Sequence, residues 1–148
     1  MTGALASVYE RFGDAHREFE CCDTTFRVQA AGIGADAAVT GARDTARSLE
    51  ARLNAFDETS AVARLNREQA VTDEHVARIV RRGLEYYDRT DGVFDIHQGR
   101  IEHDLKAFIR GESDTLPETF DTGAVRVDGD RVSTDVELDL NGLAKGYL

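Results

Sequence analysis

Apolar residues recur every three or four positions along two long stretches of this chain, a spacing that places them on one face of a helix. These stretches cover residues 36–56 and about residues 73–90. Asp73 is predicted to cap the second helix at its start, and Gly92 to end it in a left-handed conformation. Shorter helices are predicted at residues 5–12, in a single turn behind the N-cap Ser60, and around residues 101–109.

Alternating apolar and polar residues predict strands in three other places. The first is TTFRVQA at residues 24–30, and the second is a hairpin, VRVDGDRVS, at residues 125–133. VELDL at residues 136–140 is expected to form a further strand. We therefore predict an α+β fold, in which two long helices cover one face of an antiparallel or mixed sheet within a single domain of residues 1–148.

Composition and charge narrow the class of protein. A chain of 148 residues, 41% of them hydrophobic, is long enough for one domain with its own core. Its formal net charge of −10 argues against nucleic acid and anionic membranes as partners, because both attract basic proteins. Excess acidic residues with almost no lysine are typical of a halophilic protein. We find no apolar run of membrane-spanning length and no signal peptide, so we expect a cytoplasmic protein.

The last eleven residues, LDLNGLAKGYL, hold one of only two lysines among the 18 basic residues of the chain. We expect Asn141, Gly142 and Gly146 to form a sharp turn around Lys145, with free backbone amides that face an anion. A phosphate or pyrophosphate suits such a turn, since the lysine adds a positive charge. The alternative is an ordinary turn with a solvated lysine, and the spacing alone does not decide between the two.

Three other groups of residues are weaker candidates for chemistry. His97 and His103 lie near carboxylates in FDIHQGRIEHD and could bind a transition metal, but their spacing fits no compact metal site. Asn66 follows a short helix and is equally explained as the end of that helix. The adjacent Cys21 and Cys22 are poorly spaced for a disulfide and lack partner cysteines, so reduced, partly buried thiols are expected rather than a redox or metal site.

Five segments follow one another in an order found in a known family. They are CDTTFRV (22–28), the helix that reaches Phe56, DETSAVARLN (57–66), RTDGVFD (89–95) and LDLNGLAKGY (138–147). Together they resemble the N-terminal half of the ApbE family, the FAD:protein FMN transferases, over about residues 20–148. The last segment carries the strongest resemblance and the first segment the weakest.

The resemblance implies a transferase that splits FAD at its pyrophosphate with Mg²⁺ and attaches FMN to a Thr or Ser hydroxyl of an acceptor flavoprotein. In the family the acceptor is typically a subunit of a respiratory complex, and AMP leaves. By resemblance, the backbone carbonyl of Ala144 contributes to the Mg²⁺ site, and Lys145 lies near the diphosphate. The resemblance places these further residues around the flavin nucleotide: Thr24, Asn66, Asp95, Asp139, Asn141, Gly142 and Gly146.

The sequence also departs from the family pattern. Cys22-Asp23 stand where the family has Met-Gly, so an aspartate adds charge and bulk, and Asn141 replaces the first glycine of a pair. The family chain continues well beyond AKGY with residues that complete the metal site. We therefore expect a transferase portion that needs the remaining half, for which a complementary C-terminal chain is one source. The alternatives are a non-catalytic flavin-nucleotide binder or inert remnant and a small metal-binding protein that uses His97 and His103.

Overall fold

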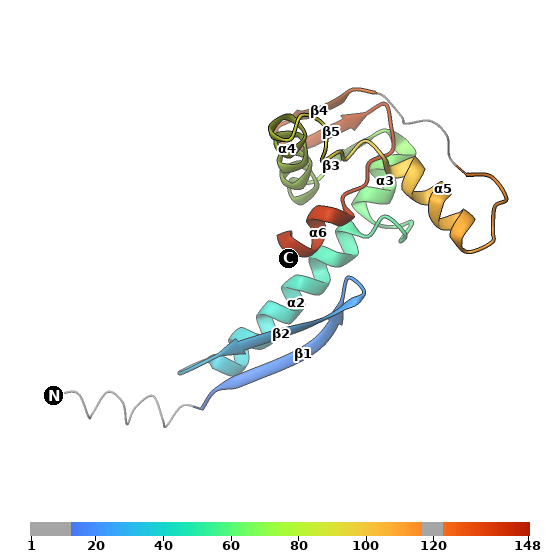
Figure 1. Ribbon diagram of the computed structural model, residues 1–148. Helices are drawn as coiled ribbons and strands as arrows, with labels where there is room; N and C mark the ends of the chain where they lie inside the picture. Colours follow the sequence, from blue (N-terminus) through green and yellow to red (C-terminus); the bar gives the residue numbers. More distant parts are fainter. Residues whose placement is uncertain (1–12, 117–122) are drawn as a thin grey trace. The chain divides into compact units, whose positions relative to one another are not determined.

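A computed structural model describes residues 13–116 and 123–148 (Figure 1). These residues fall mainly into two compact units, one that ends at Glu50 and one that runs from Ala51 to Tyr147. Each unit has its own antiparallel sheet and its own apolar cluster. The predicted α+β class with antiparallel sheets is confirmed, although two sheets take the place of one. The helix predicted at residues 5–12 lies outside the described residues, and the single domain stays a prediction.

The described helices and strands follow the predicted order closely. The first unit holds β1 (Ala15–Cys21), β2 (Thr24–Ala30) and most of α2 (Ala35–Leu53). None of the described helices is long and apolar enough to cross a membrane. The second unit holds α3 (Ala61–Glu68), β3 (Ala70–Thr72), α4 (Glu74–Arg89), α5 (Gly99–Ile109), β4 (Val125–Asp128), β5 (Arg131–Thr134) and α6 (Asn141–Tyr147).

The first unit is built on the hairpin of β1 and β2. The connecting residues Cys22 and Asp23 both have positive φ, +51° and +54°, as a two-residue type I′ turn requires. Phe19 and Phe26 face each other across the hairpin, and their ring centroids are 5.8 Å apart. The predicted strand at residues 24–30 is confirmed as β2, whereas β1 was not predicted from the sequence.

The first long helix is confirmed as α2, with different ends. It follows Gly34, whose φ of +82° is a conformation that glycine adopts without strain. It stops at Leu53 instead of reaching Phe56. The side-chain oxygen of Asn54 accepts a hydrogen bond from the backbone N–H of Phe56 at 3.0 Å, and this local turn replaces the helical hydrogen bonding.

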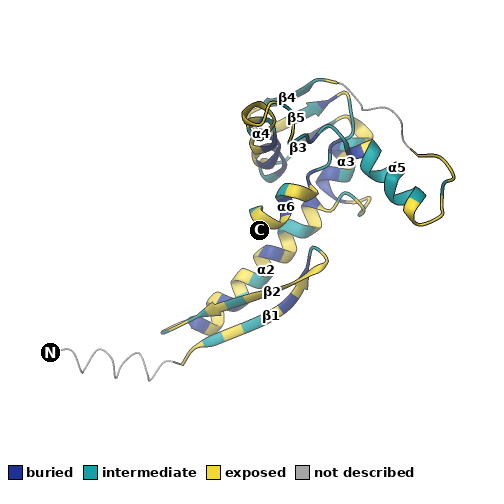
Figure 2. Ribbon diagram, in the orientation of Figure 1, coloured by how far each residue is buried: buried dark blue, intermediate teal, exposed yellow. Residues whose placement is uncertain are grey.

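In the second unit, α4 packs against a three-stranded sheet of order β3–β5–β4 (Figures 1 and 2). Val132 of β5 is fully buried in one cluster with Val76 and Val80 of α4. The predicted hairpin is confirmed as β4 and β5, and Gly129 in its turn has a φ of +54°. The long helices α2 and α4 therefore have separate sheets as neighbours, because each unit forms its own core.

The predicted caps are present in the second unit. The hydroxyl of Ser60 accepts the N–H of Ala63 at 2.9 Å, and the helix behind it, α3, is longer than the predicted single turn. Asp73 caps α4 by accepting two backbone N–H groups of the first turn, at 2.9 and 3.1 Å. Gly92 has a φ of +78° just beyond the end of α4, as predicted.

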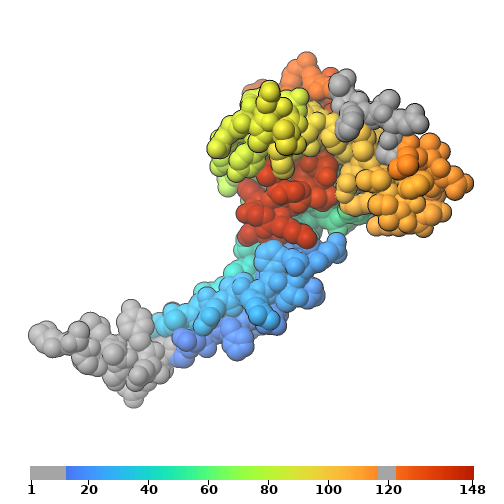
Figure 3. Space-filling model, viewed as in Figure 1, coloured from blue at the N-terminus to red at the C-terminus, as the bar shows by residue number. Residues whose placement is uncertain are grey.

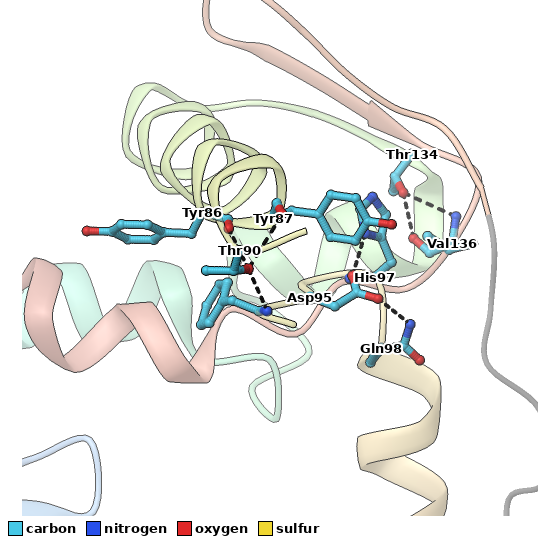
Figure 4. Close-up of polar contacts among 9 residues, drawn as sticks. Tyr86, Tyr87, Thr90, Asp95, His97, Gln98, Thr134 and Val136 are labelled. Atoms are coloured by element: carbon cyan, nitrogen blue, oxygen red, sulfur yellow. Dashed lines mark hydrogen bonds and ion pairs between the residues drawn. The ribbon is translucent and has the colours of Figure 1, made fainter. Parts of the chain in front are cut away.

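The strand predicted at residues 136–140 is wrong, because these residues join neither sheet. At the end of β5, the hydroxyl of Thr134 donates to the carbonyl of Val136 at 2.7 Å and accepts its N–H at 3.1 Å (Figure 4). This pair of hydrogen bonds turns the chain out of the sheet. Leu138 and Leu140 are nevertheless almost fully buried, so the alternating pattern reflects burial without strand pairing.

The sharp turn expected around Lys145 is also wrong, because residues 141–147 form the helix α6. Neither Gly142 nor Gly146 has positive φ. The carboxylate of Asp139 accepts the backbone N–H of Asn141 at 2.8 Å, which starts the helix in place of a turn. The glycines therefore keep helical geometry, and what they contribute is the lack of a side chain.

Candidate functional site

The side-chain amide of Asn66, near the end of α3, holds the segment that leads into α6. Its Nδ2 donates to the carbonyl of Leu138 at 3.1 Å, and its Oδ1 accepts the N–H of Leu138 at 2.9 Å. The amide thus offers one donor and one acceptor, as a neighbouring strand would. Leu138 is only 1% exposed, so its backbone groups need these partners.

The loop after α4 bonds to the same segment on another side. The N–H of Asp139 donates to the carbonyl of Ile96 at 2.9 Å, and the N–H of Gly99 donates to the carbonyl of Glu137 at 3.1 Å. A Cβ at Gly99 would lie 2.7 Å from the carbonyl carbon of Leu138. Only glycine permits so close an approach of the two backbones.

Gly83 in α4 lets α4, this loop and α6 pack together. A Cβ there would lie 2.7 Å from a methyl carbon of Ile96 and 3.3 Å from one of Leu143 in α6. A hydrogen bond of 3.0 Å also joins the hydroxyl of Tyr147 in α6 to Nδ1 of His75 in α4. Segments that are distant in the sequence therefore meet at one place in the second unit.

Thr90 fixes the start of the loop. Its hydroxyl donates to the carbonyl of Tyr86 at 2.8 Å and accepts the N–H of Phe94 at 2.9 Å (Figure 4). The ring of Phe94 meets that of Tyr86 edge-on, with centroids 5.8 Å apart. A Cβ at Gly142 would touch the Phe94 ring at 3.4 Å, so the loop also borders α6.

Asp95 follows in this loop and accepts three hydrogen bonds within it. The donors are the backbone N–H of His97 at 2.8 Å, the His97 ring at 2.5 Å and the side-chain amide of Gln98 at 2.7 Å (Figure 4). Burial alone would raise the pKa of Asp95, but these hydrogen bonds and the charge of His97 together lower it below its ordinary value. Asp95 is therefore an ionised carboxylate at neutral pH, held in place by its own loop.

The residues predicted around the lysine share one side of α6. Asn141, Gly142, Lys145 and Gly146 are all exposed, whereas Ala144 is 7% exposed and belongs to the core cluster. No ion pair of Lys145 is found among the described residues. This side of α6, defined by the four exposed residues, offers a solvated ammonium group beside two positions without side chains.

A groove of about 360 Å³ lies between α4 and α6, and the two helices adjoin in Figure 3. Gly142 and Gly146 line it from α6, while Arg78, Arg82 and Tyr86 line it from α4. The guanidinium carbon of Arg82 lies 5.9 Å from the centroid of the Tyr86 ring. Sequence analysis did not single out these α4 residues, although their spacing of four positions was a signal that they share a helix face.

Thr24 belongs to the first unit, where it is the exposed first residue of β2. The other predicted site residues belong to the second unit. Within that unit the structure brings the Asn66 amide to the backbone of Leu138, and the loop of Asp95 to the backbone of Asp139. The predicted role of Thr24 in binding the flavin nucleotide stays a prediction.

The two histidines considered as metal ligands have different partners. The ring of His97 bonds to Asp95, and that of His103 lies 3.1 Å from a carboxylate oxygen of Glu137. Neither belongs to a group of three possible metal ligands in the described part of the chain. The structure therefore gives no support to a metal site built on these histidines.

Comparison with known proteins places this architecture. Residues 22–148 match the sequence model of the ApbE family. The crystal structure of the ApbE protein from Thermotoga maritima matches with a TM-score of 0.75 at 19% identity. The match covers 91% of the present chain and 50% of the Thermotoga maritima chain. The flavin transferase ApbE from Vibrio cholerae has a TM-score of 0.74 at 14% identity, with 92% and 50% covered. This chain thus spans about half the length of these structures, and no curated protein matches it.

Proposed function

The chain belongs to the ApbE family, and on that premise we propose that it is the N-terminal portion of an FAD:protein FMN transferase. In the proposed reaction, a Thr or Ser hydroxyl of an acceptor flavoprotein attacks the phosphorus on the FMN side of the FAD pyrophosphate. A phosphoester bond forms, the bond to the AMP phosphate breaks, and AMP leaves. The proposed acceptor is a subunit of a respiratory complex.

One observation carries this proposal: hydrogen bonds join the last of the family's segments to the segment that ends at Asn66, and to Ile96, the residue directly after the segment that ends at Asp95. The amide of Asn66 pairs with the backbone of Leu138, and the carbonyl of Ile96, next to Asp95, accepts the N–H of Asp139. These segments lie far apart in the sequence, and the hydrogen bonds bring them together at one place in the second unit. Their convergence supports a shared site at the start of α6.

Phosphoryl transfer needs a fixed diphosphate and positive charge beside it. We propose that the exposed side of α6 receives the diphosphate, because Lys145 supplies a cation and the two glycines leave room for a close approach. Asp95 and Asp139 would then form a wall of the nucleotide pocket. Within this unit, the remaining residues of the proposed pocket are Asn66 and Asn141.

The residues described here do not form a complete Mg²⁺ site. Mg²⁺ prefers six oxygen ligands in near-octahedral geometry. α6 ends at Tyr147, so the carbonyl of Ala144 lies in the last turn, where helix carbonyls lack intrahelical partners, and it can serve as one ligand. No group of three carboxylates converges in the described part of the chain. The remaining oxygen ligands of the proposed Mg²⁺ site would come from the FAD diphosphate, from water or from residues other than those described.

Covalent flavin fluorescence tests the proposal directly. The chain is mixed with FAD, Mg²⁺ and a Thr-bearing acceptor peptide, with and without the second half of a related flavin transferase as a separate polypeptide. We expect flavin on the peptide only when both halves are present, and none on a control peptide with alanine in place of the threonine. Absence of transfer from a mixture in which the halves associate would contradict the transferase function.

The half-length match also favours a second candidate, a flavin-nucleotide binder without catalysis. Titration calorimetry with FAD separates the two candidates. Binding of FAD with no transfer in any mixture would favour the binder. A chain that binds no FAD, alone or with the second half, would contradict both candidates.

A further inference from the structure

Two cysteines and a glutamate meet in the first unit, away from the motifs described above. Cys21 is the last residue of β1, Cys22 is the first residue of the hairpin turn, and Glu50 lies in α2. Their two sulfur atoms and a carboxylate oxygen all lie within 4.8 Å of one another. Among the described residues this is the one group of three side chains that could hold a metal ion.

We propose that Cys21, Cys22 and Glu50 form a binding site for a thiophilic divalent metal ion, best suited to Zn²⁺. Thiolate sulfur and carboxylate oxygen are both ligands that Zn²⁺ accepts, and three protein ligands leave a fourth position for water or another ligand. The proposal does not depend on the flavin chemistry of the second unit.

The hairpin turn explains how adjacent cysteines come to face one ion. Successive side chains of a regular strand point to opposite faces, so neighbouring cysteines in a strand could not share a ligand. Cys22 has a φ of +51° and therefore leaves the strand geometry that Cys21 still follows. No metal site is expected here from the sequence, because the chain has no further cysteines, but the turn lets the two adjacent thiols and Glu50 face one another.

Glu50 is already positioned by this turn. Its Oε1 accepts the backbone N–H of Cys22 at 2.5 Å. A carboxylate has two oxygen atoms, so one can keep this hydrogen bond while the other binds a metal. In tetrahedral Zn²⁺ sites, bonds of about 2.3 Å place two thiolate sulfurs roughly 3.8 Å apart. The two sulfur atoms lie within 4.8 Å of each other, so side-chain rotation can bring them to this separation.

Access and charge also fit a bound cation. Cys21 is 2% exposed and its Sγ lies 3.7 Å from the carbonyl of Ala46, whereas Cys22 and Glu50 are half-buried. The site is thus walled on one side and open on the other, where an ion can enter and a fourth ligand can bind. Binding releases one proton from each thiol, and the two thiolates and the carboxylate then carry three negative charges against the two positive charges of the ion.

Cobalt binding tests the site, because Co²⁺ replaces Zn²⁺ and gives a thiolate-to-metal absorption band in the near ultraviolet. The reduced, metal-free chain is titrated with Co²⁺, and Zn²⁺ is then added to displace it. We expect one equivalent of Co²⁺ to produce the band and Zn²⁺ to abolish it. Absence of a band at one equivalent, or a band that Zn²⁺ does not remove, would overturn the proposal.

Variants assign the ligands. Cys22→Ser should remove the band or weaken Co²⁺ affinity at least tenfold, and Glu50→Gln should weaken it about tenfold to a hundredfold. His103→Ala serves as the matched control and should bind like the unmodified chain. A Cys22→Ser variant that keeps full affinity would exclude this site, and a Glu50→Gln variant that keeps it would exclude the glutamate.

A second measurement covers the case in which Cys22→Ser does not fold. The half-buried thiol of Cys22 in the unmodified chain is alkylated with iodoacetamide, with or without Zn²⁺, and the modified peptide is followed by mass spectrometry. Zn²⁺ should slow this modification at least tenfold, and Mg²⁺ at the same concentration should not. Equal rates with and without Zn²⁺ would overturn the proposal.

Discussion

The side-chain amide of Asn66 satisfies both backbone groups of the buried Leu138, so its removal leaves a donor and an acceptor without partners. We expect Asn66→Ala to lower the free energy of unfolding by about 3 kcal/mol, since each unsatisfied buried group costs about 1–3 kcal/mol. Urea denaturation followed by circular dichroism measures the loss. Asn54→Ala is the control, because that side chain makes one exposed hydrogen bond, and an equal loss in both variants would contradict the argument.

Lys145 tests the proposed diphosphate side of α6. We expect Lys145→Ala to weaken FAD binding about tenfold to a hundredfold, the effect of losing one charge-assisted contact. Lys106→Ala is a matched control, because this lysine is paired with Glu102 at 2.8 Å on α5. Calorimetric titration that shows the same FAD affinity for both variants would remove Lys145 from the site.

Asp73 links the cap of α4 to the pH dependence of stability. Burial alone would raise the pKa of Asp73, but the N–H of Val76, the guanidinium of Arg52 and the N–H of His75 outweigh it and lower the pKa. The unfolded chain then binds a proton more readily than the folded chain. The stabilisation by Asp73 is therefore fully present above its unfolded pKa of about 3.9 and is lost as the pH falls through the lower folded pKa.

Urea midpoints measured between neutral pH and about pH 3 check this expectation. Asp73→Asn should make the midpoint fall less steeply with decreasing pH than in the unmodified chain. It should cost about 1 kcal/mol at neutral pH, because the amide lacks the negative charge that faces Arg52 and the N-terminus of α4. Asp88→Asn makes the same chemical change at an exposed position of the same helix and serves as the control. Parallel pH profiles for Asp73→Asn and the unmodified chain would show that Asp73 does not contribute.

At the scale of elements, two glycines make opposite predictions. A Cβ at Gly99 would lie 2.7 Å from backbone atoms of Leu138, so Gly99→Ala should cost about 1–3 kcal/mol as the start of α5 is pushed away. A Cβ at Gly41, inside α2, meets nothing within 4 Å, and Gly41→Ala should stabilise the chain by about 0.5–1 kcal/mol. Thermal unfolding of the two variants gives the signs, and a shared sign would refute the packing argument.

The elements that the sequence predicted well are those whose hydrogen bonds are local. α2, α4 and the β4–β5 hairpin have periodic apolar residues and their own caps or turn glycine. β1 was not predicted because four of its seven residues are polar and its apolar face is interrupted by Arg17. Residues 136–140 imitate a strand, yet their partners are the Asn66 side chain and a loop, and no local pattern reveals such distant partners.

The sequence predicted which residues belong to the candidate site better than it predicted the backbone conformation that those residues adopt. The glycines beside Lys145 indicated a turn, but the Asp139 carboxylate starts a helix there, and the same residues lie exposed on one side of it. Arg78 and Arg82 went unnoticed because an arginine on a helix usually faces solvent for solubility alone. Their place beside α6 depends on tertiary packing, which the helix pattern does not contain.

At the scale of the whole molecule, the two units have cores of unequal size. The buried cluster of the first unit consists of Phe19, Cys21 and Ala46, whereas that of the second unit includes buried residues from α3, α4, α6, β3 and β5. Regions with few buried apolar contacts open more readily than large cores. We expect amide hydrogens of β1 and β2 to exchange at least tenfold faster than those of β5 and α4, measured by mass spectrometry, and equal rates would contradict the division.

The amide of Asn66 imitates a peptide group for one residue and no more. A true neighbouring strand would hold the backbone straight over its whole length, and the chain would leave the sheet only where that strand ended. Because the imitation is confined to Leu138, the chain can change direction both before and after this leucine. A single side chain thereby lets the polypeptide pass from the β4–β5 hairpin to α6 through the core, where Leu138 is buried, without a further strand.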